Sequence, residues 1–131
     1  MFVDASALTA MLVNERDARE LLARLQNASI RITSPLAIWE TVLAVARILG
    51  LDIKAATIAV EEFVVLVGIE VEPVPANARR AAIDAFDRFG KGRHPAALNF
   101  GDCFAYACAK HAGLPLLYKG NDFPRTDIEP A

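Results

Sequence analysis

Short apolar runs alternate with longer helical patterns along this chain, and this alternation constrains the fold more than any other feature of the sequence. Strands that alternate with helices of ten or more residues favour a mostly parallel sheet covered by helices on both faces. We therefore predict an α/β fold with a central sheet of four to five strands. Strands are expected at residues 2–3, 30–33, 69–74 and 116–118, with a weak last one near 127–129, and helices at 6–13, 15–26, 36–49, 52–67, 76–89 and from 100 onward.

The size and composition indicate one globular domain. The chain has 131 residues, of which 54% are hydrophobic and 23% are charged, which is enough for one domain with a real core and too few residues for two domains. Its net charge of −2 argues against a strongly basic nucleic-acid coat but does not exclude a nucleic-acid enzyme. No segment resembles a signal peptide or a membrane span, and the spacing of Cys103 and Cys108 favours free thiols over a disulfide. We expect a cytoplasmic protein with no membrane attachment and a single domain over residues 1–131.

Four acidic residues occur where the expected strands and helices would bring them together. Asp4 directly follows the first strand, and Asp122 comes shortly after the strand at 116–118. Glu40 lies one turn into the helix at 36–49, and Asp102 lies in the first turn of the helix that begins at Phe100. Because ligands of open α/β sheets bind outside the carboxyl ends of the strands, these acids are expected to face one crevice. Clustered carboxylates repel unless a cation lies between them, so the sequence predicts a divalent-metal site.

Two of the acids have a structural role that competes with metal binding. Asp4 could cap the helix that follows it, although Ser6 could cap that helix instead and leave Asp4 free. Asn99 and Asp102 could form a capping pair at the start of their helix. Capping is compatible with metal binding because a carboxylate has several lone pairs, and Asn99 would then orient Asp102.

Glu40 has a plainer interpretation as part of a solvated stripe. On a helical wheel it lies near Ala44 and Arg47, and away from Trp39 and Leu43. An ion pair with Arg47 would then be its only role. Its position one turn after the second strand points instead toward the same sheet edge as the other acids.

The types of donor atom determine which metal fits. Oxygen ligands with no cysteine or histidine pattern select Mg²⁺, or Mn²⁺, over zinc. Either Asn121 or Asp122 could face the crevice, and the charged Asp122 is the better ligand for a hard cation. Several carboxylates around such an ion suit phosphodiester hydrolysis by a metal-activated water. Ser6, Thr9 and Cys103 have no adjacent base, so covalent catalysis is disfavoured.

Four blocks of the sequence together carry a family pattern. They are the opening FVDASAL, the Glu40 helix after Ser34-Pro35, LNFGDCFAYA at 98–107, and LLYKGNDF at 116–123. In these blocks, which span essentially the whole chain, the sequence resembles the PIN-domain ribonucleases, and specifically the VapC-type toxins of bacterial type II toxin–antitoxin pairs.

This resemblance implies a three-layer α/β/α PIN-like fold and a Mg²⁺-dependent endoribonuclease activity. It assigns the metal site to four acids and a polar helper: Asp4, Glu40, Asp102, Asp122 and Ser6. It also implies a homodimer and a cognate antitoxin whose C-terminal segment covers the active-site groove. Relatives often carry a second acid where this chain has Asn121, so the site here would carry one negative charge less.

Basic side chains beside the acids could bind RNA phosphates, or could be ordinary solvated loop charges. They are Lys91, Arg93 and His94 before the Asn99 turn, and Lys119 and Arg125 around Asp122. Few aromatic residues lie near the expected crevice, so stacking of RNA bases is not predicted. Apolar residues at 8–13 and 58–67 exceed the needs of one small core, and they could dock an amphipathic antitoxin helix or form core and dimer contacts.

Different functions compete with the toxin interpretation. An aspartate-based phosphoryl-transfer domain partly fits Asp4 after the first strand and Lys119 after a late strand. A receiver module needs an acceptor aspartate after a middle strand, where this chain has Val74-Pro75. A phosphohydrolase of that type needs a second aspartate two residues after the first, where this chain has Ser6. A PIN nuclease with a housekeeping RNA role and a non-catalytic binding module also compete.

Overall fold

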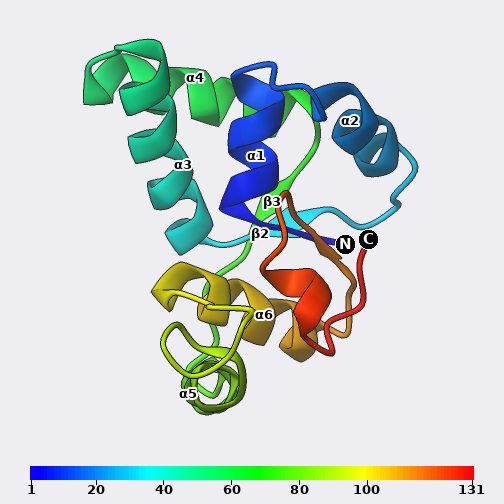
Figure 1. Cartoon of the computed structure of the whole chain (residues 1–131). Helices are drawn as coiled ribbons and strands as arrows, with labels where there is room; N and C mark the ends of the chain where they lie inside the picture. The colour runs from blue at the N-terminus through cyan, green and yellow to red at the C-terminus, as the bar shows by residue number, and fades with distance from the viewer.

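A small parallel sheet lies between two groups of helices, as Figure 1 shows. This computed structural model describes residues 1–131. The sheet has four strands in the order β3-β2-β1-β4, and every pair of neighbours is parallel. The strands are β1 (Phe2–Val3), β2 (Ile32–Thr33), β3 (Glu70–Val71) and β4 (Leu116–Leu117). The predicted three-layer α/β/α fold is confirmed.

Four helices cover one face of the sheet and two cover the other (Figure 1). The first group is α1 (Ala5–Leu12), α2 (Ala18–Gln26), α3 (Pro35–Leu49) and α4 (Ile53–Leu66). The second is α5 (Ala78–Phe89) and α6 (Phe100–Ala112), and a 3-10 turn, η1 (Phe123–Arg125), follows β4. None of these helices combines the length and hydropathy that a membrane span requires.

The alternation of side chains along each strand divides the interior into two cores. Phe2 and Leu116 are buried with residues of α5 and α6, whereas Val3 and Leu117 are buried with residues of α1 to α4. Successive strand residues point to opposite faces, so even two-residue strands contribute to both cores. This explains why every residue of β1 and β4 is apolar and buried.

The third helix illustrates how local sequence sets the helix boundaries. The Ser34 hydroxyl accepts a hydrogen bond from the Ala37 N–H at 3.2 Å, and Pro35 occupies the first turn, where its missing N–H costs nothing. Gly50 ends the helix with a left-handed φ of 65°. Both ends of α3 agree with the sequence-based prediction to within one residue.

Several strands and helices are shorter than the sequence suggests. Strand pairing stops at Val71 rather than reaching Val74, and Pro73 has no N–H to continue it. The helix expected from Glu15 begins at Ala18, because Asn14 turns the chain with a φ of 55°.

The weak last strand is reduced to a single bridge between Leu116 and Pro130. The Leu116 N–H donates to the carbonyl of Glu129 at 2.8 Å, and the Ala131 N–H donates to the carbonyl of Leu116 at 2.9 Å. The sheet therefore has four strands, at the lower end of the predicted four to five.

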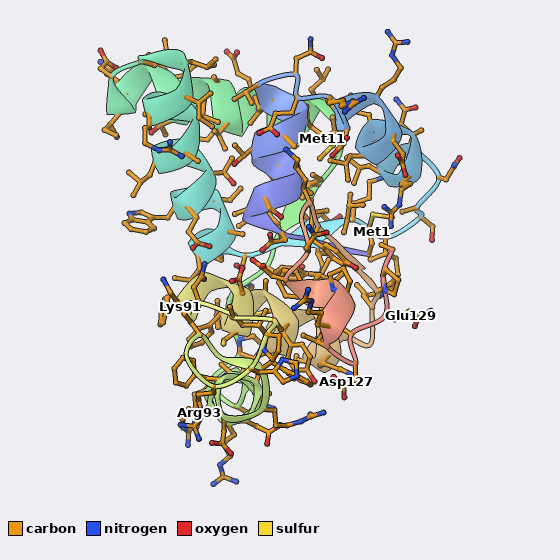
Figure 2. All side chains as sticks on the ribbon, in the orientation of Figure 1. Met1, Met11, Lys91, Arg93, Asp127 and Glu129 are labelled. Atoms are coloured by element: carbon orange, nitrogen blue, oxygen red, sulfur yellow. The ribbon has the colours of Figure 1, made fainter.

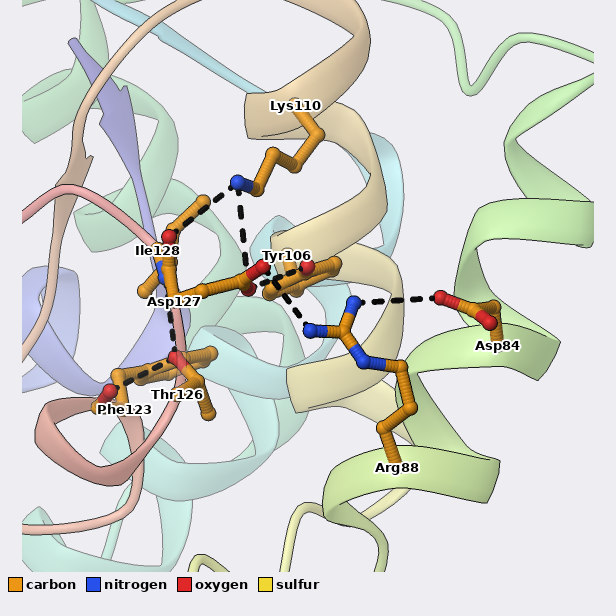
Figure 3. A network of polar contacts seen from close by, with 8 residues as sticks. All are labelled: Asp84, Arg88, Tyr106, Lys110, Phe123, Thr126, Asp127 and Ile128. Carbon is orange, nitrogen blue, oxygen red and sulfur yellow. Dashed lines mark hydrogen bonds and ion pairs between the residues drawn. The ribbon is translucent and has the colours of Figure 1, made fainter.

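Side chains hold the end of the chain against the second helical layer, as Figure 3 shows. The buried Tyr106 of α6 donates its hydroxyl to Asp127 at 2.6 Å, and Arg88 of α5 donates to the other carboxylate oxygen at 3.0 Å. Lys110 donates to the carbonyl of Asp127 at 3.2 Å. The Tyr106 hydrogen bond is the main cause that lowers the pKa of Asp127, while burial chiefly raises the pKa of Tyr106 to about 12. Polar side chains thus anchor this segment together with its single backbone bridge to β4.

Candidate active site

An open groove of about 570 Å³ lies at the carboxyl ends of β1 and β4. The first turns of α1 and α6 and the stretch of α3 from Trp39 to Ile48 border it, and Figure 1 shows the start of α3 next to that of α6. Asp4, Glu40 and Asp102 all line this groove. Residues from three distant parts of the sequence thus meet because the parallel strands and their helices all deliver them to one edge of the sheet.

Asp4 is almost fully buried, with 3% of its surface exposed. Its Oδ2 accepts hydrogen bonds from the Ser6 N–H at 2.9 Å and the Ser6 hydroxyl at 2.5 Å. Asp4 is therefore the cap of α1, and the prediction that Ser6 could cap the helix instead is wrong. Ser6 links Asp4 to the strand β4 side of the groove, because its Oγ accepts the Lys119 N–H at 2.9 Å. Burial is the main cause that raises the pKa of Asp4, and the charge of Asp122 raises it further.

Glu40 reaches across from α3 to the first turn of α6. Both of its carboxylate oxygens lie against Gly101, in the space that a Cβ at this position would occupy. A Cβ at Gly101 would therefore displace the Glu40 carboxylate, whereas the backbone conformation itself does not call for glycine. Burial, followed by the charges of Asp4 and Asp102, raises the pKa of Glu40 to about 7.

Asp102 forms the predicted capping pair with Asn99. The Asn99 N–H donates to Asp102 Oδ2 at 2.8 Å, and the Asp102 N–H donates to Asn99 Oδ1 at 3.0 Å. This pair fixes the Asp102 carboxylate at the start of α6, with its other oxygen available to the groove. Burial is the largest cause that raises the pKa of Asp102 to about 6, and the charges of Asp4 and Asp122 add to it against the hydrogen bond from Asn99.

The fourth predicted acid lies at the margin of the site. Asp122 and its neighbour Asn121 are both exposed, and neither lines the groove, although the charge of Asp122 is felt at Asp4 and Asp102. No three acidic, histidine or cysteine side chains close into a preformed metal cage. The oxygen-only donors and their mutual repulsion nevertheless match the requirements of a hard divalent cation.

The basic residues differ in how they relate to this groove. Lys119 lines it and forms an ion pair with Glu15, while Arg47 lines it without pairing with Glu40. Arg93 and Arg125 lie outside the groove lining, where Arg93 pairs with Asp87 on α5 and Arg125 donates to the carbonyl of Pro95 at 3.4 Å. In Figure 2, Lys91 lies closer to the junction of α3 and α6 than Arg93 does.

The sequence prediction missed several groove residues, including two large apolar residues within one turn of Glu40. Trp39 and Leu43 both line the groove together with Glu40, although the helical wheel places them away from it. The groove runs between α1 and α3. It is therefore lined by residues on neighbouring faces of α3, and not only by residues on the same face as Glu40. The adjacency of the only tryptophan to Glu40 was the available signal.

Comparisons with known proteins agree with this architecture. The PIN domain family model matches residues 1–129. A VapC ribonuclease of Rhizobium meliloti is 40% identical over 139 aligned residues, which cover 97% of this chain and 98% of that protein. Ribonuclease VapC30 of Mycobacterium tuberculosis is 39% identical over 128 residues, which cover 98% of this chain and 95% of that protein.

A solved structure shows the same fold. The crystal structure of Mycobacterium tuberculosis VapC20, a toxin that cleaves the sarcin–ricin loop, superposes with a TM-score of 0.76 at 20% identity. The superposition covers 99% of this chain and 97% of that one. Because the sequence and structural matches each span almost the whole chain, the protein belongs to the PIN domain family, within which its relatives are VapC ribonucleases.

Proposed function

We propose that this protein is a Mg²⁺-dependent endoribonuclease that acts as the toxin of a toxin–antitoxin pair. The observation that carries the proposal is the meeting of Asp4, Glu40 and Asp102 in one groove, with none of them in an ion pair. Burial and, to a smaller extent, nearby negative charges raise the pKa values of all three carboxylates, and a cation bound between them would offset the cost of keeping them charged. The VapC ribonuclease relatives indicate RNA as the substrate class.

The three groove acids supply the oxygen donors that Mg²⁺ or Mn²⁺ prefers, and Asp122 is the fourth donor in this proposal. A bound divalent ion supplies Lewis acidity, which activates a water and stabilises charge on the phosphodiester. The protein supplies orientation. Ser6 holds one oxygen of Asp4, and Asn99 holds one oxygen of Asp102, so each carboxylate keeps an oxygen free for the groove.

The partners follow from the same proposal. The RNA backbone would approach along the groove wall that carries Arg47 and Lys119, with Arg93 and Arg125 as more distant phosphate contacts. A cognate antitoxin would place its C-terminal segment over this groove in the cytoplasm, and the toxin would form a homodimer. Co-expression of the antitoxin encoded beside this chain should relieve growth arrest, and unchanged growth would contradict the toxin role.

The nuclease assay compares two matched aspartate substitutions. Asp4→Asn removes one groove carboxylate, whereas Asp52→Asn makes the same change at an exposed residue that caps α4 through a 2.7 Å hydrogen bond to the Ala55 N–H. We expect Asp4→Asn to lower the Mg²⁺-dependent cleavage rate by more than ~100-fold, since loss of outer metal-site partners alone costs about 10- to 100-fold. Asp52→Asn should cleave like the wild type, and EDTA should stop both. Equal cleavage by the two variants, or cleavage that survives EDTA, would refute the proposal.

A further inference from the structure

The only tryptophan of the chain lies in the groove and is largely exposed. Trp39 precedes Glu40 in α3 and has 62% of its surface accessible. It lines the groove together with Glu40 and Asp102. Because Trp39 and Glu40 are consecutive residues, their Cα atoms are about 3.8 Å apart.

This exposure is unexplained by the packing of the protein itself. Trp39 belongs to neither core, and its ring makes no aromatic pair. Leu43 and Ile48, which are 38% and 44% exposed, continue the apolar wall of the groove along α3. What distinguishes Trp39 from other exposed apolar residues is its place in the groove, where the wall that it forms with Leu43 and Ile48 is open to the apolar face of a ligand.

The surroundings of Trp39 favour a nucleotide over other occupants. Arg47 lines the groove with it, forms no ion pair and carries positive charge for phosphates, and Lys119 lines the groove in an ion pair with Glu15. A phosphodiester that a cation bridges to Asp4 and Glu40 would have a base on each side, and Trp39 lines the same groove as these acids. Unpaired RNA bases stack on exposed aromatic rings, which paired bases in a helix cannot do.

We propose that Trp39 stacks on an unpaired base next to the scissile phosphate and thereby selects single-stranded RNA. This inference rests on the proposed nuclease function and adds a residue that positions the substrate. The sequence alone did not allow stacking to be predicted, because few aromatic residues were expected near the crevice.

Phe100 provides a matched control. It is 67% exposed and lies two residues before Asp102, so it is about as exposed as Trp39 and is also near a groove acid in the sequence. Its ring pairs with Phe104 at a centroid distance of 5.0 Å, and it lines a separate cavity between α5 and α6. Truncating Phe100 should therefore leave RNA binding unchanged.

Binding is measured first without cleavage. In the Asp4→Asn protein, indole fluorescence reports on Trp39 alone, because the chain has no other tryptophan. Titration with single-stranded oligoadenylate should quench this fluorescence, and a double-stranded RNA of equal length should not. A synthetic peptide from the C-terminal end of the neighbouring antitoxin is titrated in parallel.

Substitutions then test stacking against simple packing. In the Asp4→Asn background, Trp39→Ala should weaken the binding of fluorescein-labelled oligoadenylate by about 5- to 150-fold, the range for one stacked base. Trp39→Phe should restore most of the affinity, whereas Trp39→Leu, which is apolar but has no ring, should not. With Asp4 intact, Trp39→Ala should raise KM and leave kcat nearly unchanged.

An abasic scan of the RNA locates the stacked base. At one position, removing the base should weaken binding to the protein that keeps Trp39 by the same factor as Trp39→Ala does with intact RNA. The same abasic RNA should bind the Trp39→Ala protein no more weakly than intact RNA does. Equal affinity of the Trp39→Ala and Phe100→Ala proteins, rescue by leucine, or quenching by the peptide but not by oligoadenylate would each overturn the inference. If the wild type cleaves RNA in such a case, the proposed function stands, whereas absence of Mg²⁺-dependent cleavage defeats the function itself.

Discussion

Replacing Glu40 by glutamine should stabilise the metal-free protein at neutral and alkaline pH. Glu40 has a pKa of about 7 in the fold against an ordinary 4.5, so the folded state holds a proton that the unfolded chain has lost. Stability therefore falls as the pH rises from the lower value through the higher one, and it stays reduced above. Glutamine keeps the shape and cannot ionise, which removes this penalty.

The size of the effect follows from the same two values. A pKa of about 7 in place of 4.5 corresponds to at most ~3.4 kcal/mol when Glu40 is fully ionised. Glu40 is only half-buried, so solvent screening reduces the penalty to about 1.5 kcal/mol. Glu40→Gln should raise the melting temperature in EDTA by about 6 °C near pH 8, and by almost nothing near pH 4.

Thermal unfolding followed by circular dichroism measures this difference, and divalent cations should reverse it. At about 100 times its Kd, an ion that binds only the folded state adds about 2.7 kcal/mol, and the wild type should gain more of this than Glu40→Gln. Glu61→Gln, at an exposed glutamate of α4, is the control and should show neither effect. A Glu40→Gln protein that is less stable than the wild type near pH 8, or equally shifted at both pH values, would refute the reasoning.

Three further outcomes are expected from the geometry. Gly101→Ala places a methyl group where the Glu40 carboxylate lies, so kcat should fall about 10-fold or more, while the free energy of unfolding should be unchanged or raised by up to about 1 kcal/mol. Adding Glu40→Asp to the Gly101→Ala protein shortens the displaced side chain and should recover part of the rate. At limiting Mg²⁺, kcat/KM should rise with pH as Glu40 and Asp102, with pKa values of about 7 and about 6, release the protons that compete with the ion, and saturating Mg²⁺ should flatten that rise. Tyr106→Phe removes the 2.6 Å hydrogen bond to the half-exposed Asp127 and should lower unfolding free energy in urea by about 1 kcal/mol, with cleavage unchanged.

Much of the fold could be predicted because capping side chains that act within one turn set the ends of its helices. Ser34 and Pro35 start α3 and Gly50 ends it, and the Asn99–Asp102 pair starts α6, all from side chains that act within one turn. Strand lengths could not be predicted in this way. Their ends depend on which distant segment supplies the next hydrogen bond, and an apolar residue such as Ile69 is buried whether or not its backbone pairs.

The site was predictable where strand order decides it and not where helix packing decides it. Asp4 follows β1, a central strand, so its place at the sheet edge follows from topology. The contact of Glu40 with Gly101, and the entry of Trp39 into the groove, depend on how α3 lies against α1 and α6. No pattern within α3 contains that information, so a helical wheel, which separates Trp39 from Glu40, does not reveal that both residues line one groove.

Asp4 serves the fold and the site with the same carboxylate, and this explains why its substitutions have to be chosen with care. Its Oδ2 caps α1 through Ser6, and Ser6 in turn receives the backbone N–H of Lys119 after β4. Asparagine caps a helix about as well as aspartate, so Asp4→Asn removes the charge and keeps the cap, whereas alanine removes both and costs about 1 kcal/mol more. Because burial raises the pKa of Asp4 more than its hydrogen bonds to Ser6 lower it, the capping bonds alone do not account for a carboxylate at this buried position. An asparagine would cap the helix without that penalty, so the presence of the acid is best explained by the cation that the groove is proposed to bind.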